Sequence, residues 1–578
     1  MKLRFASMVL CASLFSASAQ TRFLNDPAII SQIIETLETY KTASTFTPAE
    51  SIGADALWVK GYEGAGLYAG MWEAYSNRKL SDTPTDLQDG SSSRVIVKQG
   101  TVEKNHSNTV ARVLAGDGTL PLVDKGIAPK ALILSYTASG DEFWPEMDSV
   151  AYPKGTGNDI LVANHSFAAS AGWRSASASP SWYGVKEVSE SEEFKFGRYS
   201  KEAFLRDDEY DNTIVNNPFL SIVKSAGNDR GESGSDPYTL YEYNGGAFDV
   251  ITGTAAAPEK DGGADGYDCI PNGATGKNII TAGACENLTA DYTNKTQIVV
   301  QPVSTFGPTD DGRIKPDLVA PSGNNTSNAA PVVSGTILLV QEMYKAQTGN
   351  SDFMLASTVK ALLCHTAFEA ENDGPDYKTG WGMVNAEAAG LLIEAEESNN
   401  AEYIREESLS NSATDRFFYY IDSNATEAKI TLAWTDPKGP ALTLTYVPSD
   451  LNNSTSMLVN DLDLRLKQLC DGSEFQPYIL DPANPSVAAT TGDNRPTIQQ
   501  IHQETLAAEW YAIEDSHKGT LAATQEYSLI VEGFETPNRW TGSWSKGAAP
   551  TAADIASIES NLPVGATKIE ANHVLIAD

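Results

Sequence analysis

Four polar residues spread along the chain have the side-chain types of an activated serine nucleophile. Glu73 follows the apolar run "GLYAGMW", His106 lies in "NHSNTVARVLAG", Asn228 follows "IVKSAG", and Ser327 lies in "NNTSNAAPVVSG". A serine hydroxyl needs a base within hydrogen-bond reach, and the base needs an acid that fixes its tautomer. Asn228 and the backbone N–H of Ser327 can donate to an oxyanion. If the fold brings these residue types together, they could carry out nucleophilic attack on a carbonyl group.

Ser327 also has a simpler interpretation, because it stands between a polar turn and the helical pattern "AAPVVSGTILLVQEMYK". Serine is a favoured N-cap, since its hydroxyl accepts from unpaired backbone N–H groups of the first turn. Pro331 fits a first turn, where its missing N–H costs little. These twelve residues alone favour the capping role, so the other segments have to decide between cap and nucleophile.

The elements that position these residues alternate between strands and helices from residue 55 to 397. Buried parallel strands are predicted at "GLYAGMW", "ALILSY", "DILVANHSF", "FLSIVKSAGN" and "NIITAGA". Helices are predicted at "NTVARVLAG", "GTILLVQEMYK" and "ALLCHTAF". This alternation predicts an α/β fold with a doubly wound, mostly parallel sheet. Such sheets place their sites at the carboxyl ends of the strands, where the acid and amide candidates lie.

The pattern changes near residue 398. Alternating strands separated by Asn, Asp, Pro and Gly are predicted at "FFYYIDS", "AKITLAWTD", "LTLTYV", "LDLRLKQL" and "EYSLIVEG". They indicate an all-β sandwich domain. We therefore expect a signal peptide at 1–19, an N-terminal segment at 20–54, the α/β domain at 55–397, the β-sandwich at 398–535 and a tail at 536–578.

Several long motifs resemble those of the subtilisin-like, or subtilase, family of serine peptidases, and they follow one another in the same order as in that family. "NHSNTVAR" is similar to its histidine motif and "SAGND" to its oxyanion asparagine motif. "FGPTDDGRIKPDLVAP" followed by "TSNAAPVVSG" resembles the region around its nucleophile. "NHSFAASAGW", "DGYDCI" and the β-rich region after residue 398 resemble a secreted, bacteroidete-type subset. This resemblance outweighs the capping interpretation, although Ser327 could serve both roles.

The resemblance implies a secreted serine endopeptidase with a subtilisin-like fold. Ser327 would be the nucleophile, His106 the base, Glu73 the acid and Asn228 the oxyanion donor. Substrate would be an extended polypeptide bound by backbone pairing along a cleft. The residues expected to line this cleft lie at the end of a predicted strand and just after it: Ser166, Phe167 and Ala168.

Two departures from the family pattern keep alternatives open. The family has an aspartate where Glu73 stands, so Asp82, Asp86 or Asp89 could supply the carboxylate instead. The segment from 321 to 326 is shorter than the loop that relatives carry before the nucleophile. A catalytically impaired pseudoprotease that binds peptide or protein is therefore the alternative function. A sedolisin-type enzyme also uses a glutamate, but as its base, and this chain retains His106.

Charge and the N-terminus restrict the partners and the location. The net charge is −35, with 76 acidic and 41 basic residues, which argues against nucleic acid or an anionic membrane as a partner. Lys2 and Arg4, an apolar run and Ala17-Ser18-Ala19 make a cleavable export signal. No later apolar run is long enough to cross a membrane. We expect a secreted monomer without membrane insertion.

No cofactor is required for the chemistry, but structural Ca²⁺ is a possibility in the β-domain. Two acidic loops, "LVNDLDL" and "TGDNR", supply hard oxygen ligands of the kind that Ca²⁺ prefers. The candidate ligands are Asn460, Asp461, Asp463, Asp493 and Asn494. Solvated strand-end carboxylates explain the same residues equally well.

For the cysteines and the remaining histidines, the sequence gives weaker evidence of a catalytic role. Export leaves four cysteines and permits disulfides, with Cys269–Cys285 as the most local pairing and Cys364 as a buried thiol. His165 is expected to be buried and hydrogen-bonded at the end of a strand. No acid–serine pattern surrounds the other histidines, so we interpret these as structural: His365, His502, His517 and His573.

Overall fold

The computed structural model describes most of the chain between residues 46 and 534. The described residues are 46–74, 78–79, 85–90, 92–99, 102–103, 105–120, 124–138, 142–168, 170–174, 180–185, 195–201, 205–235, 237–244, 247–251, 257–399, 403–421, 427–440, 451–493 and 496–534. The chain forms two compact units, and every element discussed below belongs to the unit made of Thr47–Leu288 and Tyr292–Asp578. The predicted signal peptide, the tail and the predicted strand "LTLTYV" lie outside the described residues.

A seven-stranded sheet forms the centre of the α/β region, in the order β15-β14-β11-β8-β1-β7-β5. Every neighbouring pair in it is parallel. Its strands are β1 (Tyr68–Ala74), β5 (Val95–Val97), β7 (Leu132–Ala138), β8 (Ile160–His165), β11 (Ser221–Ser225), β14 (Ile280–Cys285) and β15 (Leu318–Pro321). All five predicted strands of this sheet are present, and the two short edge strands β5 and β15 are additions.

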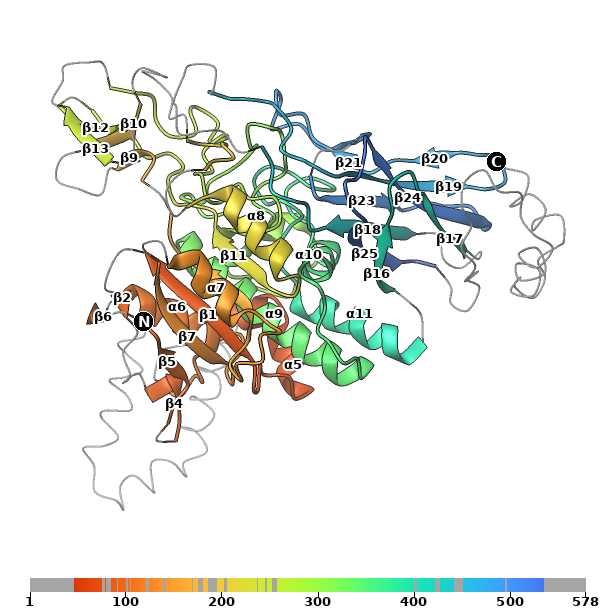
Figure 1. The fold of residues 1–578 in the computed structure, drawn as a ribbon, viewed down its shortest axis with the longest axis horizontal. Helices are drawn as coiled ribbons and strands as arrows, with labels where there is room; N and C mark the ends of the chain where they lie inside the picture. Colours follow the sequence, from red (N-terminus) through yellow and green to blue (C-terminus); the bar gives the residue numbers. More distant parts are fainter. Residues whose placement is uncertain are drawn as a thin grey trace, which may run out of the picture. The chain divides into compact units, whose positions relative to one another are not determined.

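Helices cover both faces of this sheet (Figure 1). Adjacent residues of one strand point to opposite faces, so Met71 belongs to the core under α6 (Asn105–Ala115) and α9 (Thr326–Thr348), whereas Trp72 belongs to the core under α7 (Phe143–Val150) and α8 (Asp207–Asn216). The fold is therefore doubly wound, as predicted. The other helices are α4 (Pro48–Ser51), α5 (Ala54–Val59), α10 (Ala356–His365) and α11 (Ala386–Asn399).

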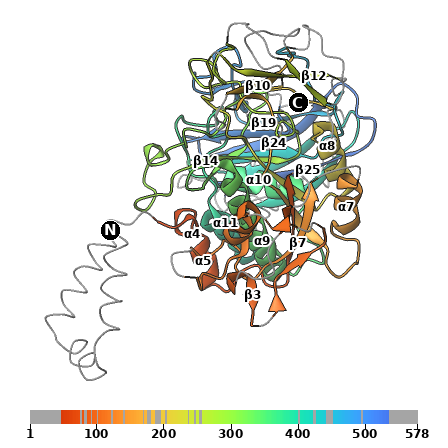
Figure 2. The same cartoon turned by 90° about the vertical axis from the view of Figure 1, so that its left-hand side faces the viewer.

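The long helix α9 organises the α/β core. It packs against five strands of the sheet and against α6 and α11, and Figures 1 and 2 show it beside α11. Its first half consists mainly of small or apolar residues, and it is buried on all sides from Ala329 to Gln341. A helix that is apolar all round is expected in a core. Its N-terminal turn carries Ser327.

The C-terminal region is built from two antiparallel four-stranded sheets. One has the order β16-β25-β18-β23 and the other β17-β24-β19-β20. Alternating side chains from both sheets form one core, which includes Ile430, Leu464 and Ile513. The strands are β16 (Ile404–Leu409), β17 (Asp415–Tyr420), β18 (Ala428–Trp434), β19 (Asp461–Gln468), β20 (Glu474–Phe475), β23 (Ile498–Gln503), β24 (Trp510–Lys518) and β25 (Gln525–Glu532). The predicted fold class is confirmed.

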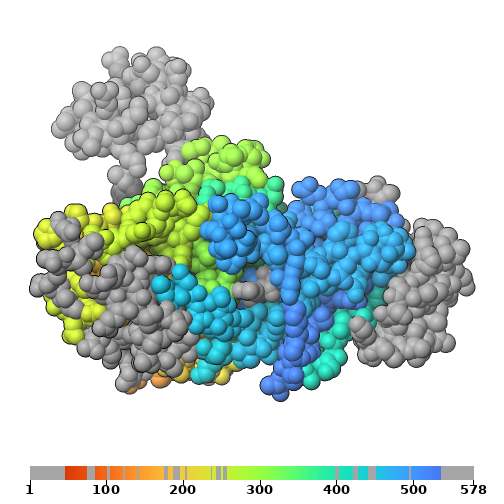
Figure 3. All heavy atoms as spheres, turned by 90° about the horizontal axis from the view of Figure 1, so that it is seen from above, coloured from red at the N-terminus to blue at the C-terminus, as the bar shows by residue number. Residues whose placement is uncertain are grey.

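The first of these sheets turns its other face to the α/β region. Ala433 and Ile530 belong to the α/β core, and α10 packs on β18 and β25. Lys277 and Asp436, both completely buried, form an ion pair across this contact. Figure 3 shows the blue and cyan residues of the β region adjoining the green residues of the α/β region.

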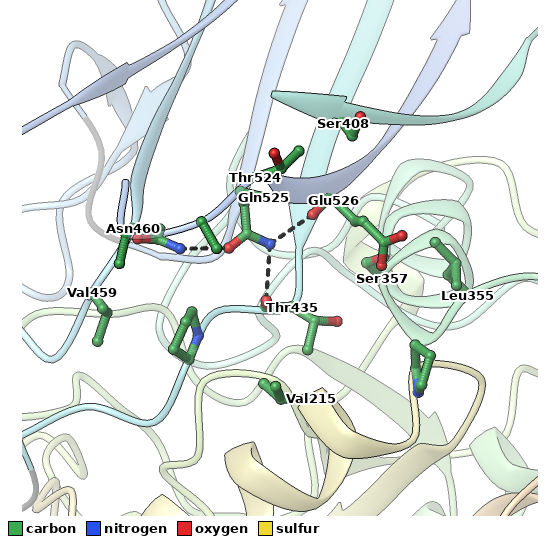
Figure 4. A pocket seen from close by; sticks show the side chains of 14 residues that line it. Val215, Leu355, Ser357, Ser408, Thr435, Val459, Asn460, Thr524, Gln525 and Glu526 are labelled. Carbon is green, nitrogen blue, oxygen red and sulfur yellow. Dashed lines mark hydrogen bonds between the residues drawn. The ribbon is translucent and has the colours of Figure 1, made fainter. Parts of the chain in front are cut away.

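A pocket opens where α8 and the start of α10 approach the loop before β25 (Figure 4). Its volume is about 570 Å³, and its lining includes Val215, Val459 and Gln525. The Gln525 amide donates to the Thr435 carbonyl and accepts from Asn460, so the polar groups there are engaged. None of the predicted catalytic residues lines this pocket.

Smaller elements complete the described fold. A four-stranded sheet, in the order β13-β12-β10-β9, follows the segment after β8. No helix among the described residues is long and apolar enough to cross a membrane. The remaining elements are β2 (Arg78–Lys79), β3 (Gln88–Asp89), β4 (Ser92–Ser93), β6 (Val102–Glu103), β9 (Gly172–Arg174), β10 (Ser181–Gly184), β12 (Thr239–Asn244), β13 (Ala247–Ile251), β21 (Tyr478–Ile479), β22 (Thr490–Thr491), η1 (Thr85–Leu87) and η2 (Lys295–Gln297).

Candidate active site

Glu73 and His106 form a hydrogen-bonded pair at the carboxyl end of β1. Glu73 Oε2 lies 2.8 Å from His106 Nδ1. The glutamate side chain is buried, with 1% exposed, whereas the histidine, in the first turn of α6, is 34% exposed. An ionised carboxylate only accepts hydrogen bonds, so Nδ1 carries the proton and Nε2 of a neutral ring is an acceptor. The pair thus presents a basic nitrogen on a half-buried ring.

The alternative carboxylates lie elsewhere. Asp86 is buried and pairs with Arg112, 3.0 Å from its Nε. Asp89 is an exposed residue of the short strand β3, and Asp82 lies outside the described residues. Among the described acids, Glu73 is therefore the one that the structure pairs with His106.

Ser327 is the second residue of α9 but not its N-cap. The side chain of Asn325 caps the helix by accepting from Asn328 N at 3.0 Å. This geometry corrects the capping interpretation of Ser327, which is 9% exposed. Asparagine is as good an N-cap as serine, so "NNTSN" contained several candidates that the sequence could not rank.

Strand pairing brings Ser327 to the edge of the sheet at which β1 ends. Trp72 pairs with His165 in the parallel sheet, so β1 and β8 end together. Ser166, the next residue, donates from Oγ to the Ser327 carbonyl at 2.7 Å, and α6 packs on α9. No hydrogen bond joins the described Ser327 hydroxyl to the His106 ring. Catalytic hydrogen bonds are often long until substrate binds.

Asn228 is held in one orientation by Thr326. Its side-chain oxygen accepts from Thr326 N at 2.9 Å and from Thr326 Oγ1 at 3.0 Å. The amide nitrogen of Asn228 is therefore turned away from these contacts as a donor. Gly227, with φ of +120°, makes the turn before it, and a Cβ there would come within 2.9 Å of Pro271. Thr326 is a site residue that the sequence analysis missed, although it directly precedes the predicted nucleophile.

In the first turn of α9, the backbone N–H of Ser327 is without an acceptor among the described residues, whereas the N–H groups on either side of it have one. Thr326 N donates to Asn228 and Asn328 N donates to Asn325. Ser327 N has no acceptor among the described atoms. The first N–H groups of a helix have no intrahelical acceptor. Ser327 N–H and Asn228 Nδ2 thus form a pair of donors suited to an oxyanion.

The predicted cleft residues differ in what their side chains do. Ser166 is 2% exposed and Phe167 is 6% exposed. The Phe167 ring packs against His165 and lies 4.7 Å from the ammonium of Lys224. Ala168 is partly exposed. Substrate binding by this segment stays a prediction, and two of its three side chains face the protein interior.

Comparison with known proteins shows the family of the chain. A family model described as "Subtilase family" (Peptidase_S8) matches residues 86–382, which is more than half of the chain. The chain belongs to the subtilase family. The match contains His106, Asn228 and Ser327, while Glu73 precedes it. The subtilase family is a family of serine-type peptidases.

More distant similarities are of limited extent. The chain is 26% identical over 253 residues to the serine protease/ABC transporter B family protein tagA of Dictyostelium discoideum, covering 35% of this chain and 14% of that protein. It spans only about a seventh of that relative. Two solved structures, the prenylagaramide maturation protease PagA and the patellamide maturation protease PatA, are each 16% identical to this chain, with TM-scores of 0.36 and 0.35. The matches cover 59% and 57% of this chain and 98% of each of the two structures.

The subtilase carries a buried lysine beside the Phe167 ring, which the sequence analysis also missed. Lys224 is completely buried in β11, and its ammonium has no hydrogen-bond partner among the described atoms. Burial lowers the pKa of Lys224 to about 7, although Asp207, Asp229 and Glu73 act in the opposite direction. His165, its neighbour on β8, is buried as predicted and contacts the Tyr210 hydroxyl at 3.0 Å.

Three of the candidate calcium ligands surround an ammonium group. Lys518 Nζ lies 3.1 Å from Asp463 Oδ1 and 3.6 Å from Asp461 Oδ2, and it also pairs with Asp493. Burial is the main cause that raises the pKa of Asp461 to about 6. As arranged here, these carboxylates fit the Lys518 cation rather than a divalent ion.

The other two candidate calcium ligands do not join this cluster. The Asn460 amide donates to Gln525 Oε1 at 2.7 Å, and Asn494 lies outside the described residues. No group of three or more His, Cys, Asp or Glu among the described residues is arranged to hold a metal ion. Calcium binding stays a prediction.

The cysteines of the described region are free thiols. Cys269, Cys285 and Cys364 are buried and Cys470 is exposed. The proposed Cys269–Cys285 disulfide is therefore wrong in this structure, whereas the buried thiol of Cys364 is confirmed. Cys269 Sγ contacts the backbone N–H of Phe306 at 3.4 Å, and Cys285 is the last residue of β14. Each thiol is packed into a different element, which explains why closeness in sequence misled the prediction.

The other described histidines have structural partners. His365 contacts Thr431 and Glu532 across the contact with the β region, each at 2.9 Å. His502 Nε2 lies 2.8 Å from Glu427 Oε1, and His517 Nε2 accepts from a backbone N–H. His573 lies outside the described residues.

Proposed function

We propose that this subtilase is an active, secreted serine endopeptidase. Ser327 is the nucleophile, His106 is the general base and Glu73 orients the imidazole. Asn228 and the Ser327 N–H stabilise the oxyanion. The observation that carries this proposal is the 2.8 Å contact between Glu73 and His106, because it supplies a glutamate with the reach to replace the family's aspartate.

The proposed reaction proceeds through an acyl-enzyme. His106 Nε2 takes the Ser327 proton as Oγ attacks the scissile carbonyl, and the carbonyl oxygen becomes an oxyanion between its two donors. The tetrahedral intermediate collapses, the C–N bond breaks, and imidazolium protonates the leaving amine. Water then attacks the ester with His106 as base again, which releases the carboxylic acid and restores the serine.

Labelling with a fluorophosphonate probe tests the proposal, since phosphonylation requires an activated serine. We expect wild-type protein to be labelled, and Ser327→Ala and His106→Ala to be unlabelled at equal loading. Ser357→Ala, which removes a buried hydroxyl in α10, is the matched control and should be labelled like wild type. Folded wild-type protein that stays unlabelled would favour the pseudoprotease alternative.

Location, assembly and substrate form are further parts of the proposal. The export signal at residues 1–19 supports secretion, and the acidic composition supports a protein without nucleic-acid partners. The substrate is proposed to be extended polypeptide beside Ser166, Phe167 and Ala168, bound to a monomer. Cleavage of an unfolded protein by culture supernatant of the expressing cell, lost in Ser327→Ala, would support both secretion and activity.

A further inference from the structure

The carbonyl group of Ser327 lacks its ordinary partner inside α9. In an α-helix the carbonyl of residue i accepts from the N–H of residue i+4. For Ser327 that residue is Pro331, which lies inside α9 and has no N–H. The carbonyl that lacks a helical donor therefore belongs to Ser327, the proposed nucleophile. A buried carbonyl without a donor costs free energy comparable to a lost hydrogen bond.

A side chain from the neighbouring strand fills this place. Ser166, 2% exposed and directly after β8, donates from Oγ to the Ser327 carbonyl at 2.7 Å. The carbonyl can only accept, so the Ser166 hydroxyl must be the donor. The Ser166 hydroxyl therefore donates to the same carbonyl oxygen that lacks an N–H donor because of Pro331.

A buried asparagine fixes the direction of this hydrogen bond. Asn164 Nδ2 donates to Ser166 Oγ at 3.0 Å, and Asn164 Oδ1 accepts from Ser334 Oγ at 3.0 Å. Asn164 and Ser334 are completely buried. The hydrogen bonds thus form a series in which Ser334 donates to Asn164, Asn164 donates to Ser166, and Ser166 donates to the Ser327 carbonyl. The Ser166 proton cannot turn elsewhere without breaking this series. The series begins and ends on α9 and holds the helix to the end of β8.

We propose that Ser166, held by Asn164 and Ser334, is a positioning residue that replaces the N–H missing at Pro331 and fixes the backbone of Ser327. This inference rests on the proposed function for its effect on catalysis. The Ser166 side chain does not contact substrate in this role. Its loss should therefore lower the rate of nucleophilic attack and leave the binding of substrate nearly unchanged.

A double-mutant cycle with Ser166→Ala and Pro331→Ala tests this replacement. The Pro331→Ala substitution restores a backbone N–H that can donate to the Ser327 carbonyl. We expect Ser166→Ala to lower the melting temperature and to reduce both kcat and the fluorophosphonate labelling rate about tenfold to a hundredfold, with KM changed less than about twofold. Adding Pro331→Ala should recover much of each loss. Ser166→Thr keeps the hydroxyl and should stay closer to wild type.

Controls separate positioning from general stability. Ser357→Ala removes a buried serine hydroxyl that contacts Ser528 at 2.8 Å, and should lower the melting temperature without changing the labelling rate. Ser334→Ala breaks the series of hydrogen bonds at its far end and should reduce the labelling rate less than Ser166→Ala does. It serves as the test variant if Ser166→Ala does not fold.

Three results would overturn the inference. Folded Ser166→Ala with the wild-type labelling rate would remove the positioning role. A raised KM with unchanged kcat would make Ser166 a substrate contact. Losses that Pro331→Ala does not relieve, in melting temperature or in rate, would show that the hydroxyl does not replace the missing N–H. Wild-type protein that is never labelled would instead contradict the proposed function, and the melting-temperature cycle would still decide the hydrogen-bond replacement.

Discussion

Glu73 Oε2 and His106 Nδ1 are hydrogen-bonded at 2.8 Å, although the two residues lie 33 positions apart in the chain. The carboxylate is buried at the end of β1, and the ring projects from the first turn of α6. This arrangement fixes Nδ1 as the donor and leaves Nε2 as the acceptor of the neutral ring. Under the proposed function, this contact is the one that orients the base.

Replacing Glu73 tests this contact directly. Glu73→Gln should lower kcat by about 10²–10⁴ with little change in KM, because the amide can stabilise the wrong tautomer and no longer stabilises imidazolium. Glu73→Asp should remain active. Steady-state kinetics on a peptide substrate measure both. Asp89→Asn, at an exposed acid, is the control, and full activity in Glu73→Gln would eliminate Glu73 as the acid.

Ser327 and Asn325 should separate activity from helix capping. Ser327→Ala should remove almost all peptidase activity with little effect on stability, because Asn325 provides the cap. Asn325→Ala should cost about 1 kcal/mol in the free energy of unfolding. Urea denaturation and activity assays give the two readouts. Wild-type peptidase activity in Ser327→Ala would refute the nucleophile assignment.

Asn228 should act on the rate rather than on substrate binding. Asn228→Ala removes one proposed oxyanion donor and should lower kcat about 10²–10³-fold with KM nearly unchanged. Thr326→Val removes the hydroxyl that holds the Asn228 oxygen at 3.0 Å, and it should cause a smaller loss in the same direction. Equal kcat values for wild type and Asn228→Ala would place the oxyanion elsewhere.

Lys224 should make stability depend on pH. Its folded pKa of about 7 lies below the unfolded value near 10.4, so between these values the unfolded chain binds more protons. Stability therefore rises with pH across this window, and the full cost of the buried ammonium is present below about pH 7. Lys224→Met should stabilise the protein most at pH 6 and progressively less toward pH 10. Urea midpoints at pH 6, 8 and 10 measure this, and a pH-independent difference would contradict it.

Lys518 offers a test of the calcium prediction. Lys518→Met removes the cation from the Asp461, Asp463 and Asp493 cluster, whose mutual repulsion should then lower the melting temperature. Added Ca²⁺ should raise the melting temperature of this variant more than that of wild type, if the freed carboxylates bind it. Lys60→Met, at an exposed pair with Glu394, is the control. Identical responses of both proteins to Ca²⁺ and to chelator would count against calcium at these loops.

The sequence by itself determined the elements and the candidate residues. Apolar runs identified five strands of the parallel sheet, because strands buried on both faces need continuous apolar sequence. Alternation identified the β-sandwich, although β18 and β25 bury residues on both faces. Motif order placed His106, Asn228 and Ser327 in a family whose chemistry they fit. These signals are local, so they can be read from spacing and residue type alone.

Only the tertiary structure decided which of these residues meet. It paired Glu73 rather than Asp86 with His106, made Asn325 the cap, placed Lys518 among the candidate calcium ligands and left Cys269 and Cys285 as free thiols. It also brought Ser166 to the carbonyl that Pro331 leaves without a donor. Hydrogen bonds depend on distances of about 3 Å between atoms far apart in the chain. Strand order and helix packing set those distances, and no local pattern in the sequence encodes them.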